Sequence, residues 1–290
     1  MSANRKVSSS TPKAATRLPM TAILIACILL LALFVRMLPV IYNISGGHVI
    51  FSGMDSYYHM RRIMYTIAHF PSTNVFDSYV NFPAGFPIYW PPLYDQISAG
   101  LSILAGLGHP GGFTIELTSA LVPALIGVLS IIPLYYIVKD TMGRHAAMIA
   151  ALIMAIVPGS VYQSLFGATD HHGLEVLLSL TMYLLFMRAL SSAYGVKPGD
   201  MTKQKKPLAY AALAGVAMAA MIFAWDGAPI FIGIVVLYSF IQYAYNAYTK
   251  ERSVYLTVVG AVASLVALVI VLPFAATGDG GSQVSALVIS

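Results

Sequence analysis

Seven long apolar stretches divide this chain, and they cover approximately residues 18–41, 113–139, 144–165, 172–194, 207–225, 227–248 and 253–275. A helix needs about 20 mainly apolar residues to cross the hydrocarbon core of a bilayer. Each stretch is about that long. The pattern therefore predicts an all-α polytopic membrane protein with about seven spans, which together form a transmembrane domain over residues 18–275.

The segment between the first two predicted spans, residues 44–112, is much longer than the other loops. It contains GMDSYYHMRRIMYTIAHFP, whose spacing predicts a short amphipathic helix that ends at Pro71. The stretch DQISAGLSILAGLG that follows is short and interrupted by glycines, so we expect an interfacial or re-entrant helix there. Loops of this length inside a compact domain are usually functional.

Composition and charge agree with a membrane protein. Of the 290 residues, 58% are hydrophobic and only 9% are charged, whereas about a quarter of an average soluble domain is charged. Lysine and arginine gather in residues 1–17 and in the loops after the second, fourth and sixth spans. Because such residues are enriched in cytoplasmic loops, we expect a cytoplasmic N-terminal tail and an external segment at 44–112. In a membrane protein the distribution of lysine and arginine matters more than the net charge, which is +5 here, and we expect no nucleic-acid partner.

The last residues, 276–290, fall on the external side in this topology. They end on QVSALVIS, without a polar tail. We expect this segment to precede further membrane spans and a C-terminal soluble domain.

Acidic and histidine side chains gather at two places on the predicted external face. One is Asp55, and the other is Asp170, His171 and His172 before the fourth span. Two carboxylates and an imidazole could converge on one divalent cation, and this mixture suits Mn²⁺ or Mg²⁺. Asp170 and His172 can share an ion only if the chain is extended between them, and Gly167 nearby permits such a turn.

These residues also have structural explanations. Asp170 could be the N-cap of the fourth span, because aspartate is favoured there, and Asp55 could cap the helix in its own segment. The adjacent histidines could anchor the chain at the membrane interface. Arg61 and Arg62 could bind phosphate, but we expect solvated charges on a helix face.

Three motifs, GMDSYYHMRR, YWPPLYD and GATDHHGLE, occur in this order with membrane spans between them. In this arrangement the chain resembles the N-terminal part of the STT3/AglB oligosaccharyltransferase family, and the D-x-H form is typical of archaeal members. The resemblance covers roughly residues 20–275. It implies a GT-C-like glycosyltransferase transmembrane bundle with a long first external loop.

The resemblance also implies site residues. The metal ligands would be Asp55, Asp170 and His172, which would hold Mn²⁺ or Mg²⁺, and Asp55 would also have a catalytic role toward the acceptor amide.

A second group would bind the donor. His171 would face the lipid phosphate, and Trp90 and Trp225 would border the donor site, although both tryptophans could also be interface anchors. Many relatives carry an arginine seven residues before the second aspartate. Gln163 occupies that position here, which puts a donor-phosphate arginine in this loop in doubt.

The implied activity is metal-dependent, inverting transfer of a glycan from a polyprenyl (dolichyl) phosphate or diphosphate donor to the asparagine of Asn-X-Ser/Thr. Its partners would be a lipid-linked oligosaccharide donor, an acceptor protein with that sequon, and membrane lipids. The site would lie on the external face of the cell membrane.

Two other classes stay open. Another polyprenyl-phosphate-sugar-dependent membrane glycosyltransferase, such as a protein mannosyltransferase, generally has adjacent acidic residues in the first external loop, whereas Asp55 is followed by Ser56. A transporter would need titratable residues inside its spans. The candidates for that role, Glu116 and Glu175, lie near span ends.

Overall fold

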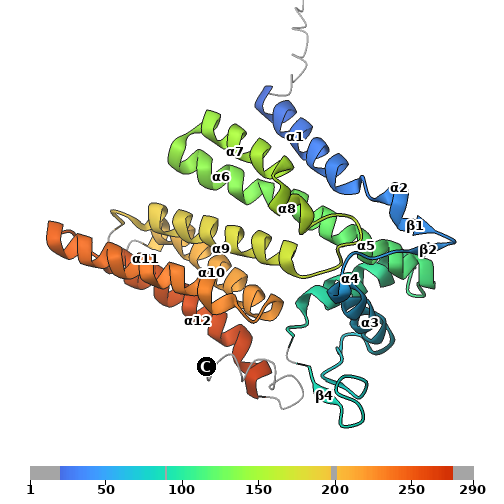
Figure 1. The fold of residues 1–290 in the computed structure, drawn as a ribbon. Helices are drawn as coiled ribbons and strands as arrows, with labels where there is room; N and C mark the ends of the chain where they lie inside the picture. The colour runs from blue at the N-terminus through green and yellow to red at the C-terminus, as the bar shows by residue number, and fades with distance from the viewer. Residues whose placement is uncertain (1–19, 89, 197–200, 277–290) are drawn as a thin grey trace, which may run out of the picture.

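The computed structural model describes residues 20–276, apart from residue 89 and residues 197–200. Figure 1 shows a molecule made almost entirely of helices, with two small two-stranded hairpins at one end. The expected all-α membrane architecture is therefore confirmed. The tail expected at 1–17 lies outside the described residues, and so does the segment expected at 276–290 beyond its first residue.

Among the residues that the structure describes, six helical segments are long and apolar enough to cross a membrane. Two of these segments each consist of two consecutive helices. One is α1 (Met20–Met37) followed by α2 (Val40–Asn43), and the other is α5 (Gly112–Leu129) followed by α6 (Ile131–Met142). The other four lie in α9 (His172–Ala193), α10 (Met201–Ala224), α11 (Ala228–Thr249) and α12 (Val254–Ala276). The chain is a multi-pass membrane protein.

The segment expected to span the membrane at 144–165 is divided into two helices. The first, α7 (Arg144–Ile156), has 13 residues, and the second is the short α8 (Pro158–Tyr162). A proline disfavours helical backbone in the residue before it, and Val157 accordingly adopts an extended conformation with φ −62° and ψ 128°. A helix as short as α7 is about 20 Å long, less than the roughly 30 Å of a hydrocarbon core.

The segment at 44–112, which the charge pattern predicts to be external, folds into small elements. They are the hairpin of β1 (Ile44–Ser45) and β2 (His48–Val49), helix α3 (Met54–His69), the hairpin of β3 (Phe76–Asp77) and β4 (Phe86–Pro87), and helix α4 (Leu93–Ala105). Helix α3 ends before Pro71, as expected. Helix α4 has 13 residues and is not among the six candidate spans, as expected for a helix that does not cross.

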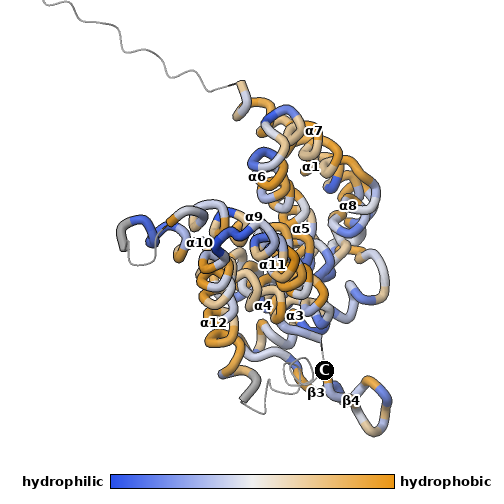
Figure 2. The backbone as a smooth tube through the Cα atoms, turned by 90° about the vertical axis from the view of Figure 1, so that its left-hand side faces the viewer, coloured by the Kyte–Doolittle hydropathy of each residue, from blue (hydrophilic) through white to orange (hydrophobic). Residues whose placement is uncertain are grey.

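Three hydrophobic clusters hold these helices together. The first cluster joins the four helices α9, α10, α11 and α12. Within it, α10 and α12 approach so closely that a Cβ at Gly215 would collide with the carbonyl oxygen of Ala263. Small residues permit such close contacts between membrane helices. The second cluster joins α1, α6 and α7. The third buries Ile63, Tyr94 and Phe166, and so fastens α3 and α4 to the bundle. Figure 2 shows the hydrophobic residues concentrated along the helices.

The C-terminal ends of α6, α9 and α11 lie at one end of the bundle, whereas α3 and α4 lie at the other (Figure 1). Two contacts tie that first end together. Arg188 Nε lies 2.9 Å from Asp140 Oδ2, and Tyr194 donates a hydrogen bond to Glu251 at 3.3 Å. The helix ends that lead into the basic loops therefore share one end, which is the arrangement that the charge pattern predicts.

Arg36, near the end of α1, is fully buried and holds the junction between α7 and α8. Its guanidinium donates hydrogen bonds to the carbonyl of Ala155 and to the hydroxyls of Ser160 and Ser164, each at 2.9 Å. The last carbonyls of a helix have no partner inside that helix. Arg36 therefore satisfies the end of α7, where Pro158 stops the helix.

We expect Arg36→Leu to lower the free energy of unfolding by about 2–4 kcal/mol, because the groups that it satisfies would stay buried without a donor. Arg252, which is exposed before α12, provides the control, and Arg252→Leu should cost less than about 0.5 kcal/mol. Thermal unfolding in detergent micelles measures both variants. Equal shifts would contradict the role of Arg36.

Candidate active site

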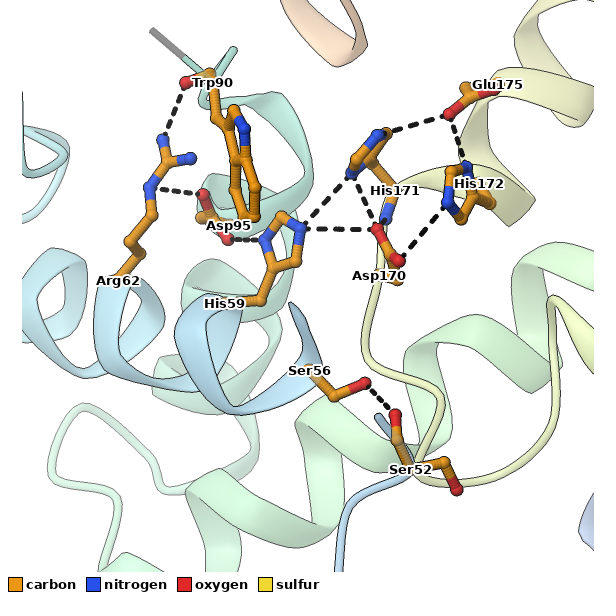
Figure 3. A network of polar contacts seen from close by, with 10 residues as sticks. All are labelled: Ser52, Ser56, His59, Arg62, Trp90, Asp95, Asp170, His171, His172 and Glu175. Atoms are coloured by element: carbon orange, nitrogen blue, oxygen red, sulfur yellow. Dashed lines mark hydrogen bonds and ion pairs between the residues drawn. The ribbon is translucent and has the colours of Figure 1, made fainter. Parts of the chain in front are cut away.

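Three charged side chains are buried between α3 and α4 and form a chain of ionic contacts (Figure 3). Asp95 Oδ1 lies 2.6 Å from His59 Nδ1, and Asp95 Oδ2 lies 3.1 Å from Arg62 Nε, in an ion pair without hydrogen-bond geometry. Arg62 Nη2 also donates to the carbonyl of Trp90 at 2.9 Å. The expectation that Arg62 is a solvated charge is therefore wrong, because α4 covers that face of α3 and supplies a counter-ion.

Arg61, the neighbouring residue, is only half-exposed and has partners of its own. Its Nη2 lies 2.9 Å from Asp77 Oδ1, and its guanidinium lies 4.6 Å from the ring centre of Tyr79. Arg61 therefore fastens α3 to the β3–β4 hairpin.

His59 connects this buried chain to the loop before α9. Its Nε2 lies 3.4 Å from Asp170 Oδ1 and 3.3 Å from His171 Nδ1. Burial works to lower the pKa of His59, but the contacts with Asp170 and Asp95 outweigh it and raise the pKa to about 9. His59 therefore carries a positive charge beside Asp170 at neutral pH.

Asp170 lies just before α9, whose N-cap residue is His171. Asp170 Oδ1 accepts a hydrogen bond from the backbone N–H of His171 at 2.6 Å and lies 2.7 Å from His171 Nδ1. Burial works to raise the pKa of Asp170, but the contacts with His171 and His59 hold it well below its usual range. Asp170 is therefore an ionised carboxylate that does not cap the helix with its side chain.

The second oxygen of Asp170 faces His172. Oδ2 of Asp170 lies 3.5 Å from Nε2 of His172, whose side chain is 38% exposed. Two ligand atoms at about 2.1 Å from one ion lie roughly 3.0–3.4 Å apart. Asp170 lies in a bend just before α9, outside the regular helix, and the 3.5 Å pair fits a divalent cation with little adjustment.

Asp55 lies in the first turn of α3, one helical turn before His59 and on the same face of that helix. The backbone N–H of Ser52 donates to the carbonyl of Gly167 at 2.9 Å, so the start of α3 is tied to the loop that carries Asp170. Asp55 is close enough to His172 to interact with it electrostatically.

Among the described residues, two groups of three side chains place possible ligand atoms within 4.8 Å of one another. One group is His59, Asp170 and His171, and the other is His171, His172 and Glu175. The structure thus brings Asp170, His171 and His172 together, whereas the exposed Asp55 belongs to neither group.

Glu175 and Asp95 belong to this cluster, although neither was predicted from the sequence to be a site residue. Glu175 Oε1 lies 2.8 Å from His172 Nδ1 and 3.3 Å from His171 Nε2. Glu175 follows His172 by three residues and His171 by four, and side chains at these spacings are neighbours on a helix, so the sequence did contain a signal for the two contacts. The partnership of Asp95 with His59 had no such signal, because it joins two helices.

Both predicted tryptophans lie at this end of the bundle. The Trp90 ring stacks on His59 with centroids 5.3 Å apart, and it lies 6.3 Å from the His171 ring. Trp225 lies in the turn between α10 and α11, next to Asp226, which is close enough to His171 to interact with it electrostatically.

We expect Asp95→Asn to lower the free energy of unfolding by about 3–5 kcal/mol, because it leaves the buried Arg62 without its counter-ion and removes the nearer of the two carboxylates beside His59. Asp140→Asn is the matched control. It breaks the partly exposed pair with Arg188 and should cost at most about 1 kcal/mol. Thermal unfolding of the two variants in detergent tests this, and a similar loss in both would contradict the importance of the buried chain.

Comparison with known proteins relates this site to one family. Residues 19–286 match the family model described as "Oligosaccharyl transferase STT3, N-terminal". The dolichyl-monophosphooligosaccharide–protein glycotransferase AglB of Haloferax volcanii is 32% identical over 238 residues, which cover 79% of this chain and 22% of that protein. The chain spans between about a fifth and a third of the length of the first curated relatives that it matches.

Solved structures show the same fold. The oligosaccharyltransferase AglB from Archaeoglobus fulgidus, in complex with an inhibitory peptide and a dolichol-phosphate, aligns with a TM-score of 0.81 at 24% identity, over 92% of this chain and 32% of that one. An Archaeoglobus fulgidus oligosaccharyltransferase in complex with Zn and sulfate aligns with a TM-score of 0.78 at 25% identity, over 91% of this chain and 35% of that one. These likenesses confirm the expected GT-C-like bundle. Since the family match covers nearly the whole sequence, the chain belongs to the STT3 family of oligosaccharyltransferases.

Proposed function

We propose that this chain is the membrane part of an oligosaccharyltransferase catalytic subunit, which transfers a glycan from a polyprenyl (dolichyl) phosphate or diphosphate to the asparagine of Asn-X-Ser/Thr in a protein. The observation that carries this proposal is the pair of Asp170 Oδ2 and His172 Nε2, 3.5 Å apart at the end of the bundle. The dolichol-phosphate and the peptide in the related structure support a lipid donor and a peptide acceptor.

The residues that would hold a divalent cation are Asp55, Asp170 and His172. Two carboxylates and one imidazole suit Mn²⁺ or Mg²⁺, and the Zn and sulfate in the related structure support a divalent cation. When bound, the cation would supply Lewis-acid stabilisation of the negative charge that develops on the departing phosphate.

The acceptor is a poor nucleophile, because the lone pair of an amide nitrogen is delocalised into its carbonyl. The carboxylate of Asp55 accepts a hydrogen bond from the acceptor N–H and helps to turn the nitrogen out of conjugation. The nitrogen then attacks the anomeric carbon from the face opposite the phosphate. The new C–N bond forms as the C–O bond to the phosphate breaks, the phosphate leaves with the bonding electron pair, and the nitrogen gives up its proton to the Asp55 carboxylate, so the anomeric carbon is inverted.

The donor phosphate lies against His171, Trp90 and Trp225 in this proposal. The two indole rings provide apolar surfaces at the end of the bundle, where a lipid can reach the site from the bilayer. The positive charge on His59 offsets part of the negative charge of the carboxylates nearby.

This site lies on the external face of the cell membrane, with the N-terminus in the cytoplasm. The basic residues that share the opposite end of the bundle support this orientation, because lysine and arginine are enriched in cytoplasmic loops.

Activity of the full-length protein tests the proposal. With added Mn²⁺, Asp55→Ala and Asp170→Ala should each reduce glycan transfer to an Asn-X-Thr peptide on the order of 100-fold or more, because each removes several kcal/mol of charge stabilisation. Asp140→Ala, at the opposite end of the bundle, should transfer at the normal rate. Normal transfer by both site variants would refute their assigned role.

Orientation can be tested with single cysteines in a Cys27→Ala background. We expect a membrane-impermeant maleimide to label Ser72→Cys on intact cells, because this exposed position follows α3. Arg252→Cys, at the other end, should be labelled only after lysis. The reverse pattern would place the site on the cytoplasmic side.

A further inference from the structure

Glu175 contacts both histidines of the candidate site through one carboxylate oxygen. Its Oε1 lies 2.8 Å from His172 Nδ1 and 3.3 Å from His171 Nε2 (Figure 3). The residue lies one helical turn into α9 and is 8% exposed. A carboxylate in such a position is costly unless it is paired, and Glu175 is paired with the two histidines.

The contact with His172 decides which ring nitrogen is free. In a neutral imidazole one nitrogen carries the proton and the other carries the lone pair. The Glu175 carboxylate accepts a hydrogen bond from Nδ1–H, so in the neutral ring the lone pair is on Nε2, which is the nitrogen that faces Asp170 Oδ2 at 3.5 Å. A metal-binding histidine is commonly held in this way by a carboxylate on its other nitrogen.

An acidic residue near the start of a helix can also stabilise the helix dipole without any partner. That role requires neither of the two histidine contacts. It also predicts that removing the carboxylate would weaken folding and leave the affinity for a metal unchanged, so the two roles can be separated by experiment.

We propose that Glu175 is a positioning residue that makes Nε2 of His172 the metal-facing nitrogen and fixes the orientation of both histidine rings. This inference rests on the proposed function, because it takes Asp170 and His172 as ligands of the cation. It adds a residue that acts on the site through His172 and does not itself touch the ion.

Mn²⁺ binding to the full-length protein provides the test, with free Mn²⁺ measured by electron paramagnetic resonance. Glu175→Gln keeps a weaker acceptor and should weaken binding about 10-fold, whereas Glu175→Leu removes the acceptor and should weaken it about 100-fold. Glycan transfer measured over a range of Mn²⁺ concentrations should show the same shifts in the Mn²⁺ requirement, with most of the maximal rate recovered at saturation.

The chain offers a matched control at a second histidine–glutamate pair. Glu116 Oε1 lies 3.1 Å from His48 Nδ1, near the start of α5. Glu116→Gln makes the same chemical change and should leave Mn²⁺ affinity unchanged. Thermal unfolding without metal shows whether each variant is folded.

The outcomes separate the inference from the function on which it rests. Normal Mn²⁺ affinity in folded Glu175→Gln and Glu175→Leu overturns the inference. If Glu175→Leu does not fold, normal affinity in Glu175→Gln alone overturns it. If Asp170→Ala and His172→Ala also bind Mn²⁺ normally, the proposed metal site itself is wrong.

Discussion

The contact between His59 and Asp170 joins the segment at 44–112 to the helix bundle, and the arrangement of the site depends on it. His59 can hold its charge in a buried position because Asp95 lies 2.6 Å away on the next helix. Asp95 is in turn balanced by Arg62. Each buried ion costs several kcal/mol if its partner is lost. Small displacements of α3 against α4 are therefore unfavourable, and the position of Asp170 is fixed as a result.

Charges of opposite sign alternate through the whole cluster. Arg62 is followed by Asp95, His59 and Asp170, and the histidines beyond Asp170 are held by Glu175. This order explains how so many ionisable groups can lie together at the end of an apolar bundle, because each one has a partner of opposite charge or a hydrogen-bond acceptor. A divalent cation beside Asp170 would continue the same order.

The apolar pattern predicted the helices well, because span length and hydrophobicity are local properties of the sequence. It did not predict the division at Pro158, where a single residue changes the backbone. The cluster of Asp170 and His172 was predicted because both lie in one short stretch. The buried state of Arg62 was missed, since nothing local shows that α4 covers it and brings Asp95 to it. Ligation by Asp55 stays a prediction.

The short stretch from Phe166 to Asp170 is fixed at nearly every residue. The N–H of Phe166 donates to the carbonyl of Arg36, that of Gly167 donates to the carbonyl of Ala120, and the hydroxyl of Thr169 donates to a carbonyl of α5. Surface loops usually tolerate insertions, but the hydrogen bonds of this stretch hold its backbone in one position. One added residue would push Asp170 away from its neighbours, so here the length of the connection matters as much as its composition.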